Sequence, residues 1–427
     1  MSALAQKILH SHTLKGVLKT SLIMPLGMAL LFVMNVLLAK SLGVTEFGGF
    51  SFAIQIATIL AIVLSGGLAN SMQKNIPALF NTNDNTYKAY MTWSTSYLCG
   101  SLTLVLLVWA SPLRDLTIAK STVSVGNVAL PVAAFLCWLW QRYYFLGKNE
   151  IVSALLYRDL IFPALILIYI LLVRPKEYKS LIVVYSLSLF VLTAIPVLRE
   201  IIASNFSGYY PKMTSIRNII GWHKVAAPMA VTSLMQLGLN SWDIILIGIF
   251  LGMSDAGIYS ISLKLALVLG LVARVVNISL AQRMSFLYAN GRKRQLDKLI
   301  SISIVISCVF GVAVFVFLLI FGKPLLGIIG DEYEGGYLLL LLLSFGQLIV
   351  CVTGPITTYL NMTNGQKKLA ITLTRWSLIA VGVNCVVLQY KPVIWCAGVS
   401  VSCIFMMKIE QIYYFFRLRN AKVSERI

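Results

Sequence analysis

Apolar runs of about 20 residues recur from one end of the chain to the other, with short polar breaks between them. At 1.5 Å per residue, a helical run of this length crosses a hydrocarbon core of ~30 Å. Helices satisfy their own backbone hydrogen bonds in lipid at such lengths. We therefore predict an all-α polytopic membrane protein with about twelve spans, over residues 20–39, 48–72, 90–110, 122–146, 152–173, 180–199, 225–250, 256–284, 299–321, 336–360, 369–389 and 393–416.

The composition excludes a soluble globular protein. Of the 427 residues, 59% are hydrophobic and 12% are charged, whereas charged residues make up about 25% of soluble domains. The net charge of +20 is spread unevenly, because every second connector is rich in Lys and Arg. This is the pattern of the positive-inside rule, which predicts both termini in the cytoplasm. We expect no nucleic-acid partner, and some of the cations can face anionic lipid headgroups.

A ten-residue motif occurs twice, as LGVTEFGGFS at residues 42–51 and as LGMSDAGIYS at residues 251–260. Each copy lies on a turn between the first two predicted spans of one half of the chain. Six spans separate the copies, so equivalent helices have the same orientation. Such a parallel repeat, about an axis along the membrane normal, is typical of two-lobed transporters. We predict a six-helix lobe over 1–205, a cytoplasmic linker over 206–221 and a second six-helix lobe over 222–427.

The motif also predicts its own local structure. Its first glycine is expected to end a helix in the left-handed conformation. Its hydroxyl residue is expected to cap the next helix, and its second glycine to let helices approach closely. These residues are Gly43, Thr45 and Gly48 in the first copy, and Gly252, Ser254 and Gly257 in the second.

Two longer segments carry a family resemblance. LLAKSLGVTEFGGFSFAIQIATILAIVLSGGL, residues 37–68, resembles the start of Wzx-type polysaccharide flippases of the multidrug/oligosaccharidyl-lipid/polysaccharide (MOP) exporter superfamily. NSWDIILIGIFLGMSDAGIYSISLKL, residues 240–265, looks like the start of their second lobe. The resemblance implies a flippase, not an enzyme, in the bacterial inner membrane. It would move an undecaprenyl-pyrophosphate-linked oligosaccharide, such as an O-antigen repeat unit, to the periplasmic leaflet by alternating access.

Asp243 and Lys264 are ionisable residues inside the predicted seventh and eighth spans. A charge near the bilayer centre costs at least ~3 kcal/mol, so such residues are functional candidates. Both lie about 12 Å below the outer ends of their spans, and we expect them to meet as an ion pair. In the functional alternative, Asp243 carries the coupling ion, H⁺ or Na⁺, and Lys264 modulates its charge or contacts the substrate.

Three arginines are further candidates. Arg274 lies deeper in the eighth span and has no carboxylate within one helical turn. Because a guanidinium binds phosphate oxygens in a bidentate manner, we predict that Arg274 binds the pyrophosphate. Alternatively, Arg274 pairs with a carbonyl or with a carboxylate of another span. Arg283 is expected to anchor the interface or to contact phosphate first, whereas Arg375 is expected to snorkel to the cytoplasmic surface.

Arg142, Arg158 and Asp159 gather at the cytoplasmic ends of spans four and five. Arg158 and Asp159 are adjacent and are expected on different faces of a helix. We predict an interhelical pair of Arg142 with Asp159, and a gate that contacts the substrate is the alternative. Uncharged polar residues in the spans either line a hydrated cavity that binds sugars or hydrogen-bond across helices; they include Asn35, Gln55, Gln236, Asn240 and Asn277.

Two other classes of function compete with the flippase. A cation-coupled drug antiporter of the same superfamily needs acidic residues in its cavity, and Asp243 beside Lys264 and Arg274 has the wrong sign for a cationic cargo. A polysaccharide polymerase or glycosyltransferase is less favoured, because every predicted outward loop is short and no nucleotide-binding or metal-binding motif is present. We expect no cofactor and no metal. We expect polymerase and chain-length proteins as partners.

Overall fold

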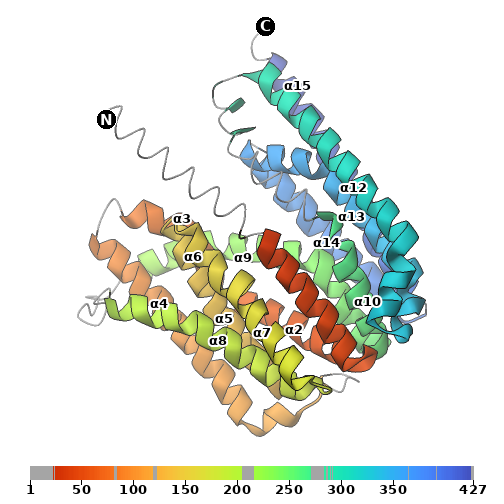
Figure 1. Cartoon of the computed structure of the whole chain (residues 1–427). Helices are drawn as coiled ribbons and strands as arrows, with labels where there is room; N and C mark the ends of the chain where they lie inside the picture. Colours follow the sequence, from red (N-terminus) through yellow and green to blue (C-terminus); the bar gives the residue numbers. More distant parts are fainter. Residues whose placement is uncertain are drawn as a thin grey trace. The chain divides into compact units, whose positions relative to one another are not determined.

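The computed structural model describes residues 23, 25–80, 84–118, 123–203, 216–270, 283–284, 287–288, 290, 292–363, 365–390 and 392–424. These residues form helices almost throughout (Figure 1). In the first half they are the helix Pro25–Leu42, α2 (Val44–Leu64), α3 (Leu68–Phe80), α4 (Asp84–Ala110), α5 (Val125–Gly147), α6 (Ile151–Leu155), the π-helix η2 (Leu156–Ile161), α7 (Phe162–Val173) and α8 (Tyr178–Ala203).

The second half has the same character. Its helices are α9 (Ile216–Phe250), α10 (Met253–Ala266), α12 (Lys293–Ile329), α13 (Tyr337–Met362), α14 (Gln366–Val387) and α15 (Val393–Ser424). Two short 3-10 helices, η1 (Pro112–Asp115) and η4 (Asp331–Gly336), lie in connections between the longer helices.

The chain divides into two compact units, each built around one central helix. Residues 1–42 and 49–234 form the first unit, in which α5 packs against α3, α4 and α8. Residues 43–48 and 235–427 form the second, in which α13 packs against α10, α12 and α15. The helices α5 and α13 correspond to the fourth predicted span of each half, as the internal repeat requires. The predicted linker at 206–221 lies largely outside the described residues, and the predicted boundaries stay predictions.

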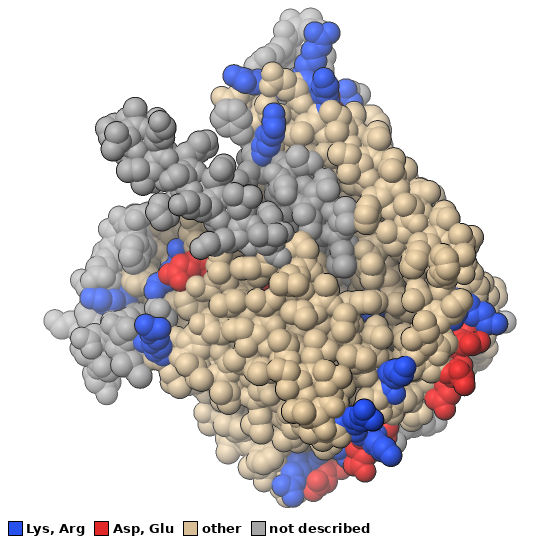
Figure 2. Space-filling model, viewed as in Figure 1, with Lys and Arg blue, Asp and Glu red and all other residues tan. Residues whose placement is uncertain are grey.

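The surface of the protein is suited to lipid. Figure 2 shows a face on which most residues are neither acidic nor basic. Large apolar side chains are exposed on the helices, among them Leu172 of α7 and Val309 of α12. Because lipid tails do not penalise exposed apolar groups, these side chains need no protein partner. The molecule is therefore a multi-pass membrane protein.

The prediction of a helical membrane protein is confirmed. Nine of the described helices are long and apolar enough to cross a membrane. A tenth candidate is α9, whose two parts, Asn218–Gly238 and Ser241–Phe250, are bent by 64°. The fourth predicted span corresponds to α5, much of which is buried among its neighbours. The eighth corresponds to α10 and to residues that lie largely outside the described part of the chain.

The second predicted span, over 48–72, is wrong as a continuous helix. It is broken at residues 65–67 between α2 and α3. Gly66 and Gly67 have φ of 56° and 73°, a left-handed conformation that ends a helix and that glycine adopts without strain. The hydroxyl of Ser65 donates to the carbonyl of Ile62, 2.8 Å away, and so satisfies one of the free carbonyls at the end of α2.

The two copies of the motif form equivalent turns. The first glycine has a positive φ in both copies, 76° at Gly43 and 122° at Gly252, although the ψ of 178° at Gly252 departs from the predicted left-handed helical conformation. The predicted caps, Thr45 and Ser254, are wrong, because both residues lie inside the helices that follow. The carbonyl oxygens of Gly43 and Gly252 already accept the first helical hydrogen bonds, at 3.0 and 3.2 Å. Each glycine therefore ends one helix and starts the next.

The second glycine of each copy allows the two copies to pack against each other inside the second unit. A methyl group on Gly48 would overlap the carbonyl oxygen of Met253. A methyl group on Gly257 would overlap the carbonyl oxygen of Val44. The predicted close approach at these glycines is confirmed, and residues 43–48 belong to the second unit because of it.

We predict that Gly48→Ala destabilises the protein by about 2 kcal/mol, because the added methyl group has to displace a backbone carbonyl. The melting temperature of the purified protein in detergent would report the loss. Gly382→Ala is the matched control, since Gly382 of α14 has no described atom within 4 Å of an added Cβ. That change should leave the melting temperature unchanged or raise it slightly. Equal melting of the two variants would contradict the close contact.

Candidate functional site

Asp243 of α9 is the centre of a buried polar cluster in the second unit. Its side chain is 5% exposed. The hydroxyl of Tyr259 in α10 donates a hydrogen bond to Oδ2, and the Asn384 amide of α14 donates to Oδ1 at 3.1 Å. The same amide donates to the hydroxyl of Ser400 in α15 at 3.0 Å. Three neighbouring helices thus supply neutral groups around one carboxylate.

The predicted ion pair of Asp243 with Lys264 is wrong. Tyr259 and Lys264 are five residues apart on α10, so their side chains point about 140° apart around the helix. Tyr259 is the one that faces Asp243. The ammonium of Lys264 instead lies 4.5 Å from the ring centroid of Phe47, in the motif segment that packs on α10. Such a cation–π contact offsets part of the cost of burying the charge.

Asp243 therefore lacks a neutralising cation among the residues that the structure describes. A cavity with room for about one water molecule lies beside it, lined by Trp242, Ser377 and Ser400 among others. The carbonyl oxygen Oδ1 of Asn384, whose amide contacts Asp243, is buried and accepts no hydrogen bond from the described part of the chain. A buried carboxylate is costly unless its charge is neutralised. The cluster has the oxygen atoms to hold a proton or a small cation.

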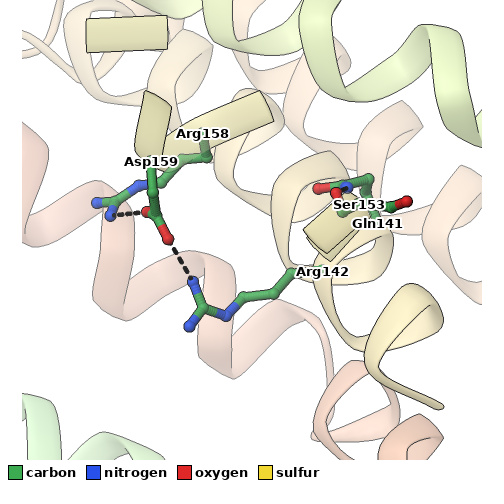
Figure 3. Close-up of polar contacts among 5 residues, drawn as sticks. All are labelled: Gln141, Arg142, Ser153, Arg158 and Asp159. Carbon is green, nitrogen blue, oxygen red and sulfur yellow. Dashed lines mark hydrogen bonds and ion pairs between the residues drawn. The ribbon is translucent and has the colours of Figure 1, made fainter. Parts of the chain in front are cut away.

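A second charged cluster lies in the first unit (Figure 3). Arg142 of α5 is 3.5 Å from Oδ2 of Asp159, which confirms the predicted interhelical pair. Arg158 is 3.0 Å from Oδ1 of the same carboxylate. The expectation that Arg158 and Asp159 point to different faces is therefore wrong. Both lie in the π-helix η2, whose turns hold more residues than those of an α-helix, so adjacent side chains diverge less.

Trp138 of α5 makes cation–π contacts with both guanidiniums. Its ring centroid is 5.4 Å from the Cζ of Arg142 and 4.7 Å from the Cζ of Arg158. Two arginines thus share one tryptophan and one carboxylate, which leaves the cluster with a net positive charge. The three charged side chains are only 28%, 27% and 15% exposed, in the order Arg142, Arg158 and Asp159.

Lys408 of α15 is a buried cation that the sequence alone did not single out as a site residue. Its side chain is 6% exposed. The ammonium donates to Oγ1 of Thr357 at 3.0 Å and to Oε1 of Gln411 at 3.1 Å. Both partners are neutral. The signal was present in the sequence, since Lys408 lies inside the predicted span 393–416.

Arg375 of α14 forms an ion pair with Glu410 of α15 and its side chain is 51% exposed, so its expected position at the cytoplasmic surface stays a prediction. The indole of Trp376 donates to the same carboxylate at 2.9 Å. Here one arginine meets one carboxylate, and the charges balance. This pair differs in that respect from the cluster around Asp159.

Two family models match the chain. A model described as polysaccharide biosynthesis protein matches residues 13–281, which is more than half of the chain. The chain belongs to this family. The MatE model matches residues 228–387. Among curated proteins, no relative matches this sequence significantly.

Solved structures show the same fold as this chain. It is similar to the lipid II flippase MurJ in an inward closed conformation, with 15% identity and a TM-score of 0.73 over 93% of this chain and 87% of that chain. It is also similar to an inward-facing multidrug resistance MATE family transporter of the MOP superfamily, with 13% identity and a TM-score of 0.60 over 95% of this chain and 98% of that chain.

A third similar structure is the MATE multidrug transporter DinF-BH, with 13% identity and a TM-score of 0.63 over 95% of this chain and 96% of that chain. The predicted two-lobe MOP fold is thereby confirmed. The family and the fold together identify a transporter or flippase of the MOP superfamily, and not an enzyme.

In this family member, the other predicted site residues fall into two groups. Asn35 donates to the carbonyl of Leu31 in its own helix at 2.6 Å, Gln55 is half-buried on α2, and Arg283 is exposed. The side chains of three further candidates lie outside the described residues, and their roles stay predictions: Asn240, Arg274 and Asn277.

Loss of the Tyr259 hydroxyl should destabilise the protein. Tyr259→Phe removes a donor from a buried carboxylate, which costs about 2 kcal/mol. We expect a lower melting temperature in detergent. Tyr413→Phe is the control, because Tyr413 is 59% exposed. Identical melting of the two variants would show that Tyr259 does not support Asp243.

Proposed function

We propose that this chain is a flippase that moves an undecaprenyl-pyrophosphate-linked oligosaccharide from the cytoplasmic to the periplasmic leaflet of a bacterial inner membrane. The proposal rests on the positive charge inside the spans. Among the described residues, carboxylates do not balance this charge. Lys264 contacts an aromatic ring, Lys408 contacts neutral groups, and Arg142 and Arg158 share one carboxylate.

The sign of this charge favours an anionic cargo. A cation inside a span is costly and is usually functional. Guanidinium and ammonium groups bind phosphate through charge-assisted hydrogen bonds, which are about twice as strong as neutral ones. A cationic drug would be repelled by the same groups. The description of the matching family as polysaccharide biosynthesis protein, and the fold shared with a lipid II flippase, support a lipid-linked glycan.

We infer an alternating-access mechanism, as the two-repeat architecture suggests. With the cavity open to the cytoplasm, Arg274 would bind the pyrophosphate and Arg283 would attract it. The sugars would contact the polar side chains of the spans, while the polyprenyl tail stays in lipid; these side chains include Asn35, Gln55, Asn240 and Asn277. A polysaccharide polymerase and chain-length proteins would use the product outside.

The energy for transport would come from an H⁺ or Na⁺ gradient that acts at Asp243. The support for this step is the buried carboxylate with neutral donors and the buried Asn384 oxygen beside it. Loading and release of a cation there would change the charge of the cluster by one. Such a change can bias the packing of α9, α10, α14 and α15, because all four contribute to the cluster.

Depletion of the protein should cause one complete oligosaccharide-pyrophosphate lipid to accumulate on the cytoplasmic face, because its route outward is lost. Mass spectrometry of the glycolipids with leaflet assignment would measure this. Wild type should clear the lipid, whereas Arg274→Ala should not. Arg417→Ala, at an exposed position of α15, is the control and should clear it.

Each other result has its own consequence. If no such lipid accumulates, the flippase is excluded and the antiporter takes its place. If the lipid accumulates outside and unpolymerised, the polymerase takes its place. If Arg274→Ala clears the lipid as wild type does, the flippase stands but the role of Arg274 is wrong.

Asp243→Asn should abolish gradient-driven flipping while the protein still inserts, because the amide cannot carry the coupling charge. Flipping would be measured in energised vesicles with and without an ionophore that collapses the gradient. The matched control is Asp115→Asn, since the Asp115 side chain is 79% exposed. Normal flipping by Asp243→Asn would remove this residue from the mechanism.

A further inference from the structure

We propose that Arg142 and Arg158 form a binding site for the pyrophosphate of the cargo, and that Asp159 occupies this arginine pair when no cargo is bound. The site lies in the first unit, where α5 meets the π-helix η2 (Figure 3). The inference rests on the proposed function, since it names a further place on the molecule where that cargo binds.

The carboxylate of Asp159 contacts the two arginines in the way that a diphosphate would. Each of its oxygens faces a different guanidinium, Oδ1 at 3.0 Å from Arg158 and Oδ2 at 3.5 Å from Arg142. The longer contact is at the limit of a hydrogen bond, so Asp159 binds Arg142 only weakly. A guanidinium has five N–H donors. Each arginine therefore keeps donors for the oxygens of a second anion.

The charge of the cluster also calls for a further anion. Two guanidiniums against one carboxylate leave one positive charge, and the low dielectric of the surroundings makes that charge costly. A pyrophosphate carries more negative charge and more acceptor oxygens than a carboxylate, so it can bind both arginines in a bidentate manner. The arginines are about one quarter exposed, so a ligand can reach them.

The arginines are positioned in advance. Trp138 contacts both guanidiniums, which favours their positions beside its ring. The Gln141 side chain donates to the backbone carbonyl of Ser153 at 2.9 Å, and so ties α5 to the segment that carries Arg158 (Figure 3). Ordered side chains lose less entropy when a ligand binds.

Backbone packing fixes the segment on its other side. A methyl group on Gly27 would overlap the backbone of Asp159, so the helix Pro25–Leu42 packs closely on this residue. The contact involves mainly the backbone carbonyl, and the carboxyl group can move away from the arginines. Single π-turns inside helices are frequent at functional sites. Here the π-turn is what brings Arg158 and Asp159 together.

The chain offers a matched control in the second unit. Arg375 also pairs with a carboxylate, that of Glu410, and also lies near an indole, with its Cζ 5.7 Å from the ring centroid of Trp376. The pair has one cation for one anion and is therefore neutral. A change at Arg375 should leave pyrophosphate binding unaltered if the unbalanced charge at Asp159 is what attracts the cargo.

Isothermal titration calorimetry of the full chain in lipid nanodiscs would test the site. The probe is farnesyl pyrophosphate, and farnesol measures the binding of the prenyl chain alone. Arg158→Gln and Arg142→Gln should each weaken binding of farnesyl pyrophosphate about tenfold, the effect of one lost charge-assisted contact. Binding of farnesol should not change. Arg375→Gln should bind farnesyl pyrophosphate as wild type does.

Asp159→Asn tests the second half of the proposal. If the carboxylate competes with the cargo, its loss should tighten binding of farnesyl pyrophosphate about threefold or more, because a like charge leaves the site. If Asp159 has only a structural role, binding should weaken or stay the same, which would overturn this half. Arg158→Lys keeps the charge but loses the planar guanidinium, so it should bind more weakly than wild type, and it tests the site even if the Gln variants unfold.

The outcomes separate this site from the function. Equal binding by wild type, Arg158→Lys, Arg158→Gln and Arg142→Gln would overturn the site. If depletion of the protein still causes the glycolipid to accumulate inside, the flippase would then stand without it. If depletion causes no accumulation, the proposed function fails, and the site with it.

Discussion

A backbone surrounded by lipid has to satisfy its hydrogen bonds within its own helix, and this constraint governs the rest of the protein. It makes every described long segment helical and lets large apolar side chains remain exposed. It also makes each departure from a regular helix costly. Departures from a regular helix therefore mark places where packing compensates for the cost. In this chain they are the break at residues 65–67, the positive-φ glycines of the motif and the π-helix η2.

The same constraint applies to polar and charged side chains. Asp243 is acceptable in the second unit because Tyr259 and Asn384 donate to it. Lys408 is acceptable because Thr357 and Gln411 accept from it. Within the described part of the chain, neither Asp243 nor Lys408 is compensated by an opposite charge. A buried group that is solvated by neutral dipoles can change its charge state with less rearrangement than a member of an ion pair, which has to abandon its partner.

The two units have similar helical architectures but carry different charged groups. In the first, two arginines converge on one carboxylate, so the local charge favours an anion. In the second, the Asp243 carboxylate lies among neutral donors, so the charge at that cluster favours a cation. The proposed transport assigns the coupling ion to the cluster around Asp243 and the pyrophosphate to arginines of both units. The internal repeat supplies two similar scaffolds, and substitutions on them supply the difference.

The sequence by itself determined the helical membrane fold, the repeat and the glycine-dependent turns, because hydropathy, span length and backbone conformation depend on local residues. It also indicated the pair of Arg142 with Asp159. Only the tertiary structure decided that Tyr259, and not Lys264, meets Asp243, that Arg158 joins the ion pair of Arg142 with Asp159, and that Lys408 is buried. These contacts depend on how each helix is rotated about its axis and on a change from α to π geometry. Packing against neighbouring helices sets both, and the position of a residue along the chain does not.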